Sequence, residues 1–199
     1  MSGQIMSATT QLFVVRHGET EWSLSGRHTS HTDLPLTAHG EDQARRCGAY
    51  LQAFTFDRVL SSPRQRARRT ADLAVPGVPV TVDPDLAEWD YGDYEGRTSK
   101  DIEAEHPQWV LFRDGCPGGE TAQQVSDRAD RLIARIRQSP GHVAVFSHGH
   151  FGCVLGARWI GLAILEAQHL TLSPASLSVL GYSSSHADVP VITQWNRAP

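Results

Sequence analysis

Short runs of apolar residues alternate along this chain with segments of helical periodicity, and this alternation restricts the fold more than any other feature. Residues 12–15 and 142–146 are apolar, partly β-branched runs of strand length. Thr121 is placed to cap a helix whose apolar stripe consists of Val125, Ala129, Leu132, Ile133 and Ile136. Strands that alternate with helices predict an α/β fold built on a largely parallel sheet.

Weaker patterns complete the expected fold. Further strands are predicted at residues 59–60, 78–82, 177–179 and 189–195. Helices are predicted to be capped by Thr37, by Thr98 with Asp101, and by Ser62 with Pro63 at the first helical position. A last helix is expected over residues 151–160. We expect residues 1–10 to be a flexible lead-in and residues 11–199 to form a single domain.

Composition excludes several classes of function. The formal net charge of −4 disfavours a nucleic-acid partner, because such proteins usually carry a strongly basic face. The most apolar stretch, residues 151–165, contains Arg158 and is too short to cross a bilayer, so no membrane partner is expected. Cys47, Cys116 and Cys153 lie far apart, which favours a reducing, cytoplasmic compartment. A homodimer is left open.

Two predicted strands end in the same dipeptide. The first is followed by Arg16, His17 and Gly18, and the fourth by His148 and Gly149. If the two strands are neighbours, the two imidazoles face each other across one pocket at the carboxyl edge of the sheet. A glycine after each histidine lets a ligand approach the backbone closely.

A third motif follows the second predicted strand and opens a helix, in the order Ser-Ser-Pro-Arg-Gln-Arg-Ala. A helix N-terminus attracts anions through its free N–H groups and its dipole. Arg66 lies in the first turn, from which it can point into the same crevice. Arg68 and Arg69 are interpreted as a solvated face, and the role of Arg64 is left undecided.

Glu88 supplies a carboxylate at the end of an apolar stretch, next to Trp89 and Tyr91. A carboxyl group partly desolvated by these aromatic rings could hold a proton at neutral pH and act as a general acid. The alternative is an acidic loop with buried aromatic anchors.

These motifs, in this order, resemble the histidine phosphatase superfamily, the phosphoglycerate mutase-like fold. The resemblance rests on the run Arg16 to Thr20, the Ser-Ser-Pro-x-x-Arg-Ala run and the late Ser147-His148-Gly149, and it covers nearly the whole chain. It implies a three-layer α/β/α sandwich around a mixed six-stranded sheet. It also implies that His17 is the phosphorylated nucleophile, that Arg16, Arg66 and His148 surround the phosphoryl group, and that Glu88 is the proton donor.

The chemistry of phosphoryl transfer agrees with these roles. The transferred group spreads negative charge over three oxygens, which arginine can hold bidentately. The nucleophile His17 needs its second ring nitrogen tied to a backbone carbonyl, so that the attacking nitrogen is unprotonated. His148 can be charged and help to bind the phosphoryl oxygens. No metal and no other cofactor are required.

Several features favour a phosphatase over a mutase. The segment from Glu88 to His148 is shorter than in the cofactor-dependent mutases, which should admit water to a phosphohistidine. Residues 88–96 and 112–116 look like those of the sedoheptulose-bisphosphatase and small acid-phosphatase branch. Ser23 and Thr29 are candidate donors to phosphoryl oxygens, although the mutases usually have Asn at the first of these positions.

The substrate is expected to be a small phosphorylated metabolite such as a sugar phosphate or bisphosphate, and an aryl or nucleoside ester is left open. A bisphosphate needs a second anion site, for which Arg64, Arg113 and Arg27 are candidates. Three other functions stay open: a phosphoglycerate mutase, a catalytically silent phosphate-binding protein, and a metallohydrolase that uses histidines such as His148 and His150.

Overall fold

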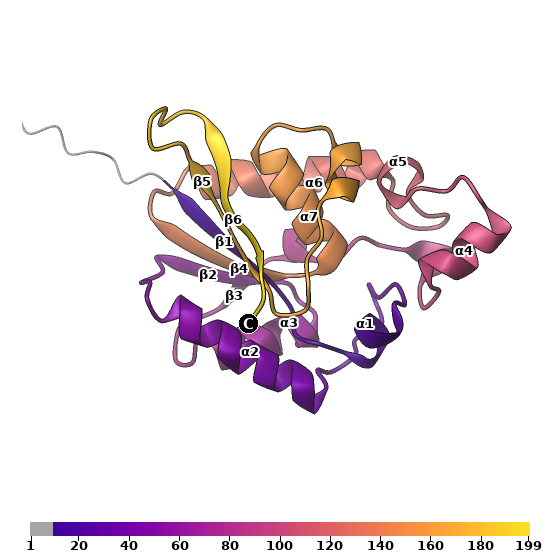
Figure 1. Cartoon of the computed structure of the whole chain (residues 1–199), viewed down its shortest axis with the longest axis horizontal. Coiled ribbons are helices and arrows are strands. Elements are labelled where there is room, and N and C mark those ends of the chain that lie inside the picture. Colours follow the sequence, from indigo (N-terminus) through magenta and orange to yellow (C-terminus); the bar gives the residue numbers. More distant parts are fainter. Residues whose placement is uncertain (1–9) are drawn as a thin grey trace, which may run out of the picture.

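The central element of the structure is a six-stranded sheet with helices on both faces (Figure 1). The computed structural model describes residues 10–199. The strands are β1 (Gln11–Arg16), β2 (Arg58–Ser61), β3 (Thr81–Val82), β4 (His142–Ser147), β5 (Leu177–Tyr182) and β6 (Pro190–Arg197), in the spatial order β3-β2-β4-β1-β5-β6. β1, β2, β3 and β4 run parallel, whereas β5 and β6 are antiparallel to their neighbours, so the sheet is mixed.

The helices form the two outer layers. They are α1 (Glu21–Ser25), α2 (Ala38–Leu51), α3 (Gln65–Ala74), α4 (Ser99–Glu105), α5 (Leu111–Asp114), α6 (Ala122–Arg137) and α7 (Gly149–Trp159), with the 3-10 helices η1 (Pro84–Leu86), η2 (Gly92–Tyr94) and η3 (Ile164–His169). α2 and α3 cover one face of the sheet, and α6 and α7 cover the other (Figure 1). This three-layer arrangement confirms the predicted fold class.

The pairing of β1 with β4 determines where the functional motifs meet. The two strands are parallel and in register, with Arg16 opposite Ser147. The backbone N–H of His17 donates to the carbonyl of Ser147 at 2.9 Å, so the pairing continues to the first motif. The His-Gly pairs that follow the two strands therefore leave the sheet side by side, as the sequence analysis required.

Two predicted elements differ from the structure. The strand expected over residues 78–82 is reduced to Thr81–Val82, because β3 is an edge strand that pairs with β2 at only two positions. The helix expected to start at Ser62 starts at Gln65, and its N-cap is Arg64. The physical reason is that the N–H of Ser62 donates to the carbonyl of Phe146 at 2.9 Å, which keeps Ser62 in the sheet.

The ends of the other elements follow the sequence more closely. Thr37, Thr98 and Thr121 each cap the helix predicted for them, and their hydroxyls accept an N–H from the first turn. The helix expected from Phe151 starts at Gly149. Most of the predicted lead-in lies outside the described residues, but Thr10 is buried and donates to the carbonyl of Ser139.

Two glycines hold the first motif against α2. A Cβ atom on Gly18 would lie 2.3 Å from the carbonyl oxygen of Gly40, and one on Gly40 would lie 2.2 Å from that of Glu19. Real Cβ atoms do not approach backbone atoms so closely. The space beside Gly18 is thus filled by protein backbone, and not by a ligand as the sequence analysis expected.

Regarding membranes, none of the helices in the described part of the chain is long and apolar enough to span a bilayer.

Candidate active site

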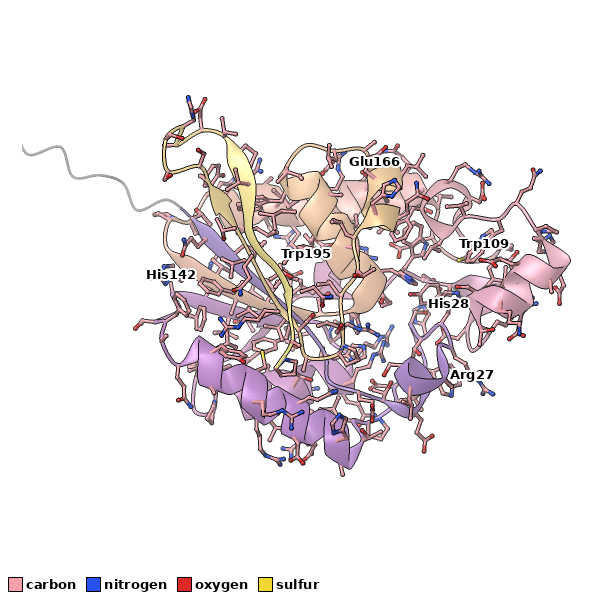
Figure 2. The ribbon with its side chains drawn as sticks, in the orientation of Figure 1. Arg27, His28, Trp109, His142, Glu166 and Trp195 are labelled. Atoms are coloured by element: carbon pink, nitrogen blue, oxygen red, sulfur yellow. The ribbon has the colours of Figure 1, made fainter. Side chains whose placement is uncertain are left out.

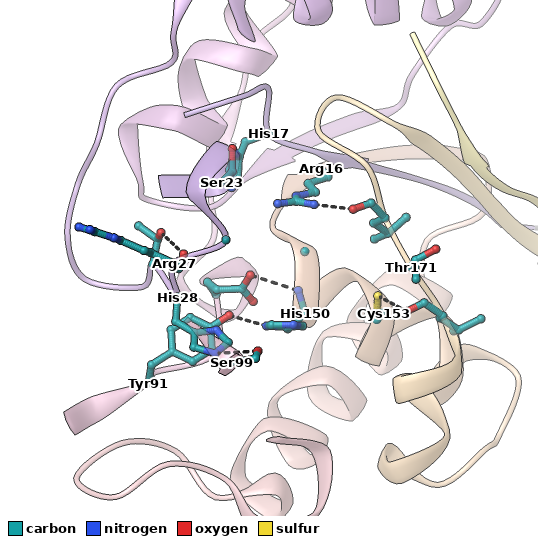
Figure 3. Close-up of a pocket in the computed structure, with 16 residues that line it drawn as sticks. Arg16, His17, Ser23, Arg27, His28, Tyr91, Ser99, His150, Cys153 and Thr171 are labelled. Carbon is teal, nitrogen blue, oxygen red and sulfur yellow. Dashed lines mark hydrogen bonds between the residues drawn. The ribbon is translucent and has the colours of Figure 1, made fainter. Parts of the chain in front are cut away.

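A cavity of about 310 Å³ opens at the carboxyl ends of β1 and β4 (Figure 3). Its volume lies at the lower end of the range for small-molecule sites. Six of the residues predicted from the sequence line it, namely Arg16, His17, Ser23, Thr29, Glu88 and Gly149. One cavity therefore brings together the segment after β1, the segment after η1 and the start of α7, as predicted for a shared site.

His17 has the hydrogen bond that a histidine nucleophile needs. Its Nδ1 lies 2.7 Å from the carbonyl oxygen of Gly18, which can only accept a proton. The proton of the neutral ring is thus on Nδ1, and Nε2 keeps a free lone pair. Burial and the charges of Arg66 and Arg16 lower the pKa of His17 well below its ordinary value, so the ring is neutral at physiological pH.

His148 lies beside His17, with the ring centroids 5.2 Å apart. Its Nε2 is 2.7 Å from the hydroxyl of Ser62, and its buried Nδ1 has no partner among the described residues. The Ser62 hydroxyl accepts the N–H of Arg64 at 3.3 Å, which leaves its own proton free to donate to Nε2. Nδ1–H is then a neutral donor for an incoming oxygen.

The surroundings of His148 affect its charge. Burial and the nearby cations Arg66 and Arg16 lower the pKa of His148 well below its ordinary value. This direction favours a neutral ring, and the expected charge of His148 beside a phosphoryl group stays a prediction. Ser62, which was predicted only to start a helix, instead orients this imidazole.

Arg66 lies in the first turn of α3, as predicted, but it is completely buried, and neither Arg66 nor His148 is among the residues that line the cavity. Its Nη atoms donate to the carbonyls of Thr29, Ser30 and Thr32, at 3.0–3.3 Å. Arg16 donates from Nη1 to the carbonyl of Leu172. The Nε atoms of both arginines are buried without a partner among the described residues, so each guanidinium keeps a donor for a ligand.

Glu88 is held by backbone N–H groups. Its two carboxylate oxygens accept N–H groups from Trp89, His150 and Phe151 at 2.8–3.1 Å, the last two in the first turn of α7. These three donors fix the position of the carboxyl group at the start of α7. The Trp89 indole donates to the Glu120 carbonyl. The proton-donor role of Glu88 stays a prediction.

The predicted substrate-binding residues fall into two groups. Ser23 and Thr29 line the cavity, but their hydroxyls donate to the carbonyls of Thr20 and Arg27. Gly149 also lines it, and a Cβ atom there would lie 3.3 Å from the guanidinium carbon of Arg16. The structure does not bring Arg64 and Arg113 to the cavity: Arg64 contacts His31 at 2.8 Å, and Arg113 pairs with Asp114 on the surface.

Other lining residues were considered in the sequence only for different roles, or for none. Arg27 was a candidate for a second anion site, Tyr91 a neighbour of Glu88 and His150 a metal ligand, whereas no role was predicted for Ser99 and residues 170–172. In Figure 2, His28 lies between Arg27 and Trp109, and the rings of His28 and Trp109 are 6.0 Å apart. No local motif marks these residues, because only the tertiary fold brings them together.

Two histidines that a metallohydrolase could use, His31 and His150, contact other side chains. His31 lies between Asp90 and Arg64, and His150 contacts the hydroxyl of Tyr91 at 2.6 Å. Within residues 10–199, the structure contains no group of three or more His, Cys, Asp or Glu side chains arranged to hold a metal ion.

Comparison with known proteins defines the class of this site. The model of the histidine phosphatase superfamily (branch 1) matches residues 12–197, and the chain belongs to this family. The acid phosphatase of Mycobacterium tuberculosis is 40% identical over 187 residues, covering 92% of this chain and 91% of that protein. The sedoheptulose 1,7-bisphosphatase of Saccharomyces cerevisiae is 41% identical over 191 residues, covering 79% of this chain and 70% of the yeast protein.

A solved structure shows that the fold is similar as well. A functionally characterised open-reading-frame product of Mycobacterium tuberculosis superimposes with a TM-score of 0.88 at 38% identity, covering 95% of this chain and 98% of that one. Together with the family match, this similarity identifies the chain as a phosphatase of the branch predicted from the sequence.

The pKa of His28 leads to a prediction about stability. Burial, assisted by His150, lowers the pKa of His28 to about 4, compared with 6.5 for an unperturbed ring. Between these values the unfolded chain binds the additional proton, so His28 contributes less to stability as the pH falls from 6.5 to 4. The stability advantage of the wild type over His28→Gln should shrink by up to about 1.4 kcal/mol per pH unit in this window. Urea unfolding of both proteins at several pH values measures this difference in the free energy of unfolding. A difference that does not change with pH would contradict the lowered pKa of His28.

Proposed function

We propose that this phosphatase hydrolyses phosphate monoesters through a phosphohistidine on Nε2 of His17. The observation that supports the proposal most directly is the contact between Nδ1 of His17 and the Gly18 carbonyl, because it directs the unprotonated Nε2 to the ligand. Nε2 attacks phosphorus, and the bond from phosphorus to the ester oxygen breaks. Water then attacks the phosphohistidine, which releases inorganic phosphate and restores the free imidazole.

The groups around His17 are suited to stabilise the charge on the phosphoryl oxygens. Arg16 and Arg66 each keep a buried Nε–H without a partner in residues 10–199, and Nδ1 of His148 is a third such group. Donors that are already oriented need no reorganisation when charge develops in the transition state. Their positions are set by backbone carbonyls and by Ser62, which makes the phosphoryl site rigid before the substrate arrives.

Glu88 is the carboxylate placed to move the proton. Glu88 lines the same cavity as His17 and Arg16, and in this mechanism it carries a proton when the ester binds. Glu88 then protonates the leaving oxygen, and afterwards it takes a proton from the attacking water. The N–H donors of α7 hold its carboxyl group in one place during both steps.

One experiment separates hydrolysis from the mutase reaction. With 3-phosphoglycerate as the substrate, a phosphatase transfers the phosphoryl group to water and releases phosphate. A mutase returns it to the other hydroxyl and forms 2-phosphoglycerate. We expect phosphate as the dominant product in a combined phosphate and NMR assay, and dominant isomerisation would replace the proposal by the mutase function.

Replacement of Glu88 tests its role as the acid. Glu88→Gln should slow phosphohistidine formation most for alkyl esters, because their leaving oxygens need a proton in the transition state. For p-nitrophenyl phosphate the leaving group is stable without protonation, so this step should slow much less. A pre-steady-state burst with both esters measures the step separately from dephosphorylation. Equal slowing of both bursts would remove Glu88 from the acid role.

We also propose a reducing, cytoplasmic compartment. The supporting observation is that Cys47, Cys116 and Cys153 are all free and buried, as is typical of proteins that are not exposed to oxidising conditions.

A further inference from the structure

The two ends of the active-site cavity differ in chemistry. At one end are His17 and Arg16, next to the predicted phosphoryl position. The other, which we call the far end, is lined by His28, Tyr91, Ser99 and His150. Figure 3 shows His17 and Tyr91 at opposite ends of the lining set. Because Nε2 of His17 attacks phosphorus, the leaving group of the ester occupies the far end.

The polar groups of the far end are uncharged. Nδ1 of His150 is 2.6 Å from the hydroxyl of Tyr91, and the ring of His28 packs against that of Tyr91 with the centroids 4.5 Å apart. Burial is the main cause that lowers the pKa of both His28 and His150 to about 4. Both imidazoles are therefore neutral at physiological pH. The hydroxyl of Ser99 adds a further neutral donor and acceptor.

None of the three arginines considered for a second anion site supplies a charge to the far end. Arg27 lines the cavity, but its guanidinium points away from the other labelled side chains (Figure 3). Arg64 contacts His31, and Arg113 pairs with Asp114 outside the cavity. A second phosphate or a carboxylate bound there would lose its hydration without gaining a cationic partner.

We propose that the far end binds an uncharged, hydroxyl-bearing leaving group, so that the preferred substrates are small phosphate monoesters with no second anionic group. This inference rests on the proposed function and adds the substrate class to it. The hydroxyls and imidazoles match the hydroxyl groups of a sugar or polyol. The structure thereby disfavours the bisphosphate that the sequence analysis included among the candidate substrates.

Matched substrate pairs test the proposal. Fructose 6-phosphate is compared with fructose 1,6-bisphosphate, and glycerol 3-phosphate with 3-phosphoglycerate, with released phosphate as the readout. Within each pair the two substrates differ mainly in one anionic group. We expect kcat/KM to be at least about tenfold higher for the substrate without it, which corresponds to a penalty of about 1.4 kcal/mol. Equal values, or a preference for the more anionic member of both pairs, would overturn the proposal.

A charge placed at the far end should reverse part of this preference. Ser99 is exposed at the start of α4 and lines the cavity, so a lysine fits there. Ser99→Lys should reduce the ratio of the two kcat/KM values within each pair by roughly tenfold, because the lysine gives the second anion a cationic partner. Ala104→Lys adds the same charge to an exposed position of the same helix, away from the cavity, and should leave the ratios unchanged. Equal shifts in both variants would mean that bulk charge, and not the far end, sets the preference.

The proposed function and the assignment of the far end can be contradicted separately. Wild-type protein that neither turns over p-nitrophenyl phosphate nor forms a phosphohistidine would contradict the proposed function. Protein that does both, but shows no discrimination within the substrate pairs, would contradict only the assignment of the far end.

Discussion

His17→Ala should reduce turnover of every phosphate ester by about 10⁴-fold or more, because it removes the atom that carries the phosphoryl group. Rapid quenching of the wild-type enzyme during turnover should trap a phosphoryl group that is labile to acid and stable to base, as expected of a phosphohistidine. The variant should trap none. Activity assays combined with phosphopeptide mapping measure both effects.

The control for this variant is His39→Ala. His39 is exposed on α2 and does not line the cavity, so its loss should leave kcat/KM within about twofold of the wild type. Because His17 is itself buried, circular dichroism and thermal melting must show that the variant folds, and His17→Asn provides a second variant with a polar side chain. A trapped phosphoserine or phosphoaspartate in the wild type would refute the mechanism.

Arg66→Ala should lower kcat/KM by on the order of a hundredfold or more, the typical cost of removing one oriented donor from a charged transition state. The same change leaves the carbonyls of Thr29, Ser30 and Thr32 without the guanidinium that they now contact. We therefore expect a lower melting temperature as well. Arg66→Lys should recover only part of the activity, because an ammonium group cannot make these contacts and bind the phosphoryl group together.

Arg68→Ala is the matched control for Arg66. The two arginines lie on the same helix, but Arg68 is exposed whereas Arg66 is completely buried. Assays are done well below the melting temperature of each variant, so that the loss of rate is not a loss of folded protein. A comparable loss for Arg68→Ala would show that the phosphoryl site lies elsewhere on the helix.

Local signals were sufficient to predict the fold class and the phosphoryl end of the site. A buried strand is recognisable from its apolar run, and a residue directly after it lies at the edge of the sheet wherever the strand pairs. This is why His17, Gly149 and Arg66 could be placed from the sequence. The edge strand β3 was predicted too long because three alternating valines resemble a half-buried strand, although Val78 and Val82 are exposed.

The far end could not be predicted in this way. His28 follows α1, Tyr91 and Ser99 lie on either side of η2, and His150 lies in the first turn of α7. No periodicity links these residues, because their proximity depends on how the segments that carry them pack. The contact between His148 and Ser62 could not be predicted for a related reason, since the two residues lie 86 positions apart in the chain.

The close contact between Gly18 and Gly40 fixes the position of residues 17–19 relative to α2. Gly40 does not line the cavity, yet any side chain there would push on the segment that carries Glu19 and, next to it, Gly18. The position of His17, the proposed nucleophile, therefore depends on the first turn of α2, a helix on the surface of the molecule. Residues at the far end of the cavity can be changed to accept new substrates. Position 40 should be kept as glycine, although the cavity lining alone does not show this.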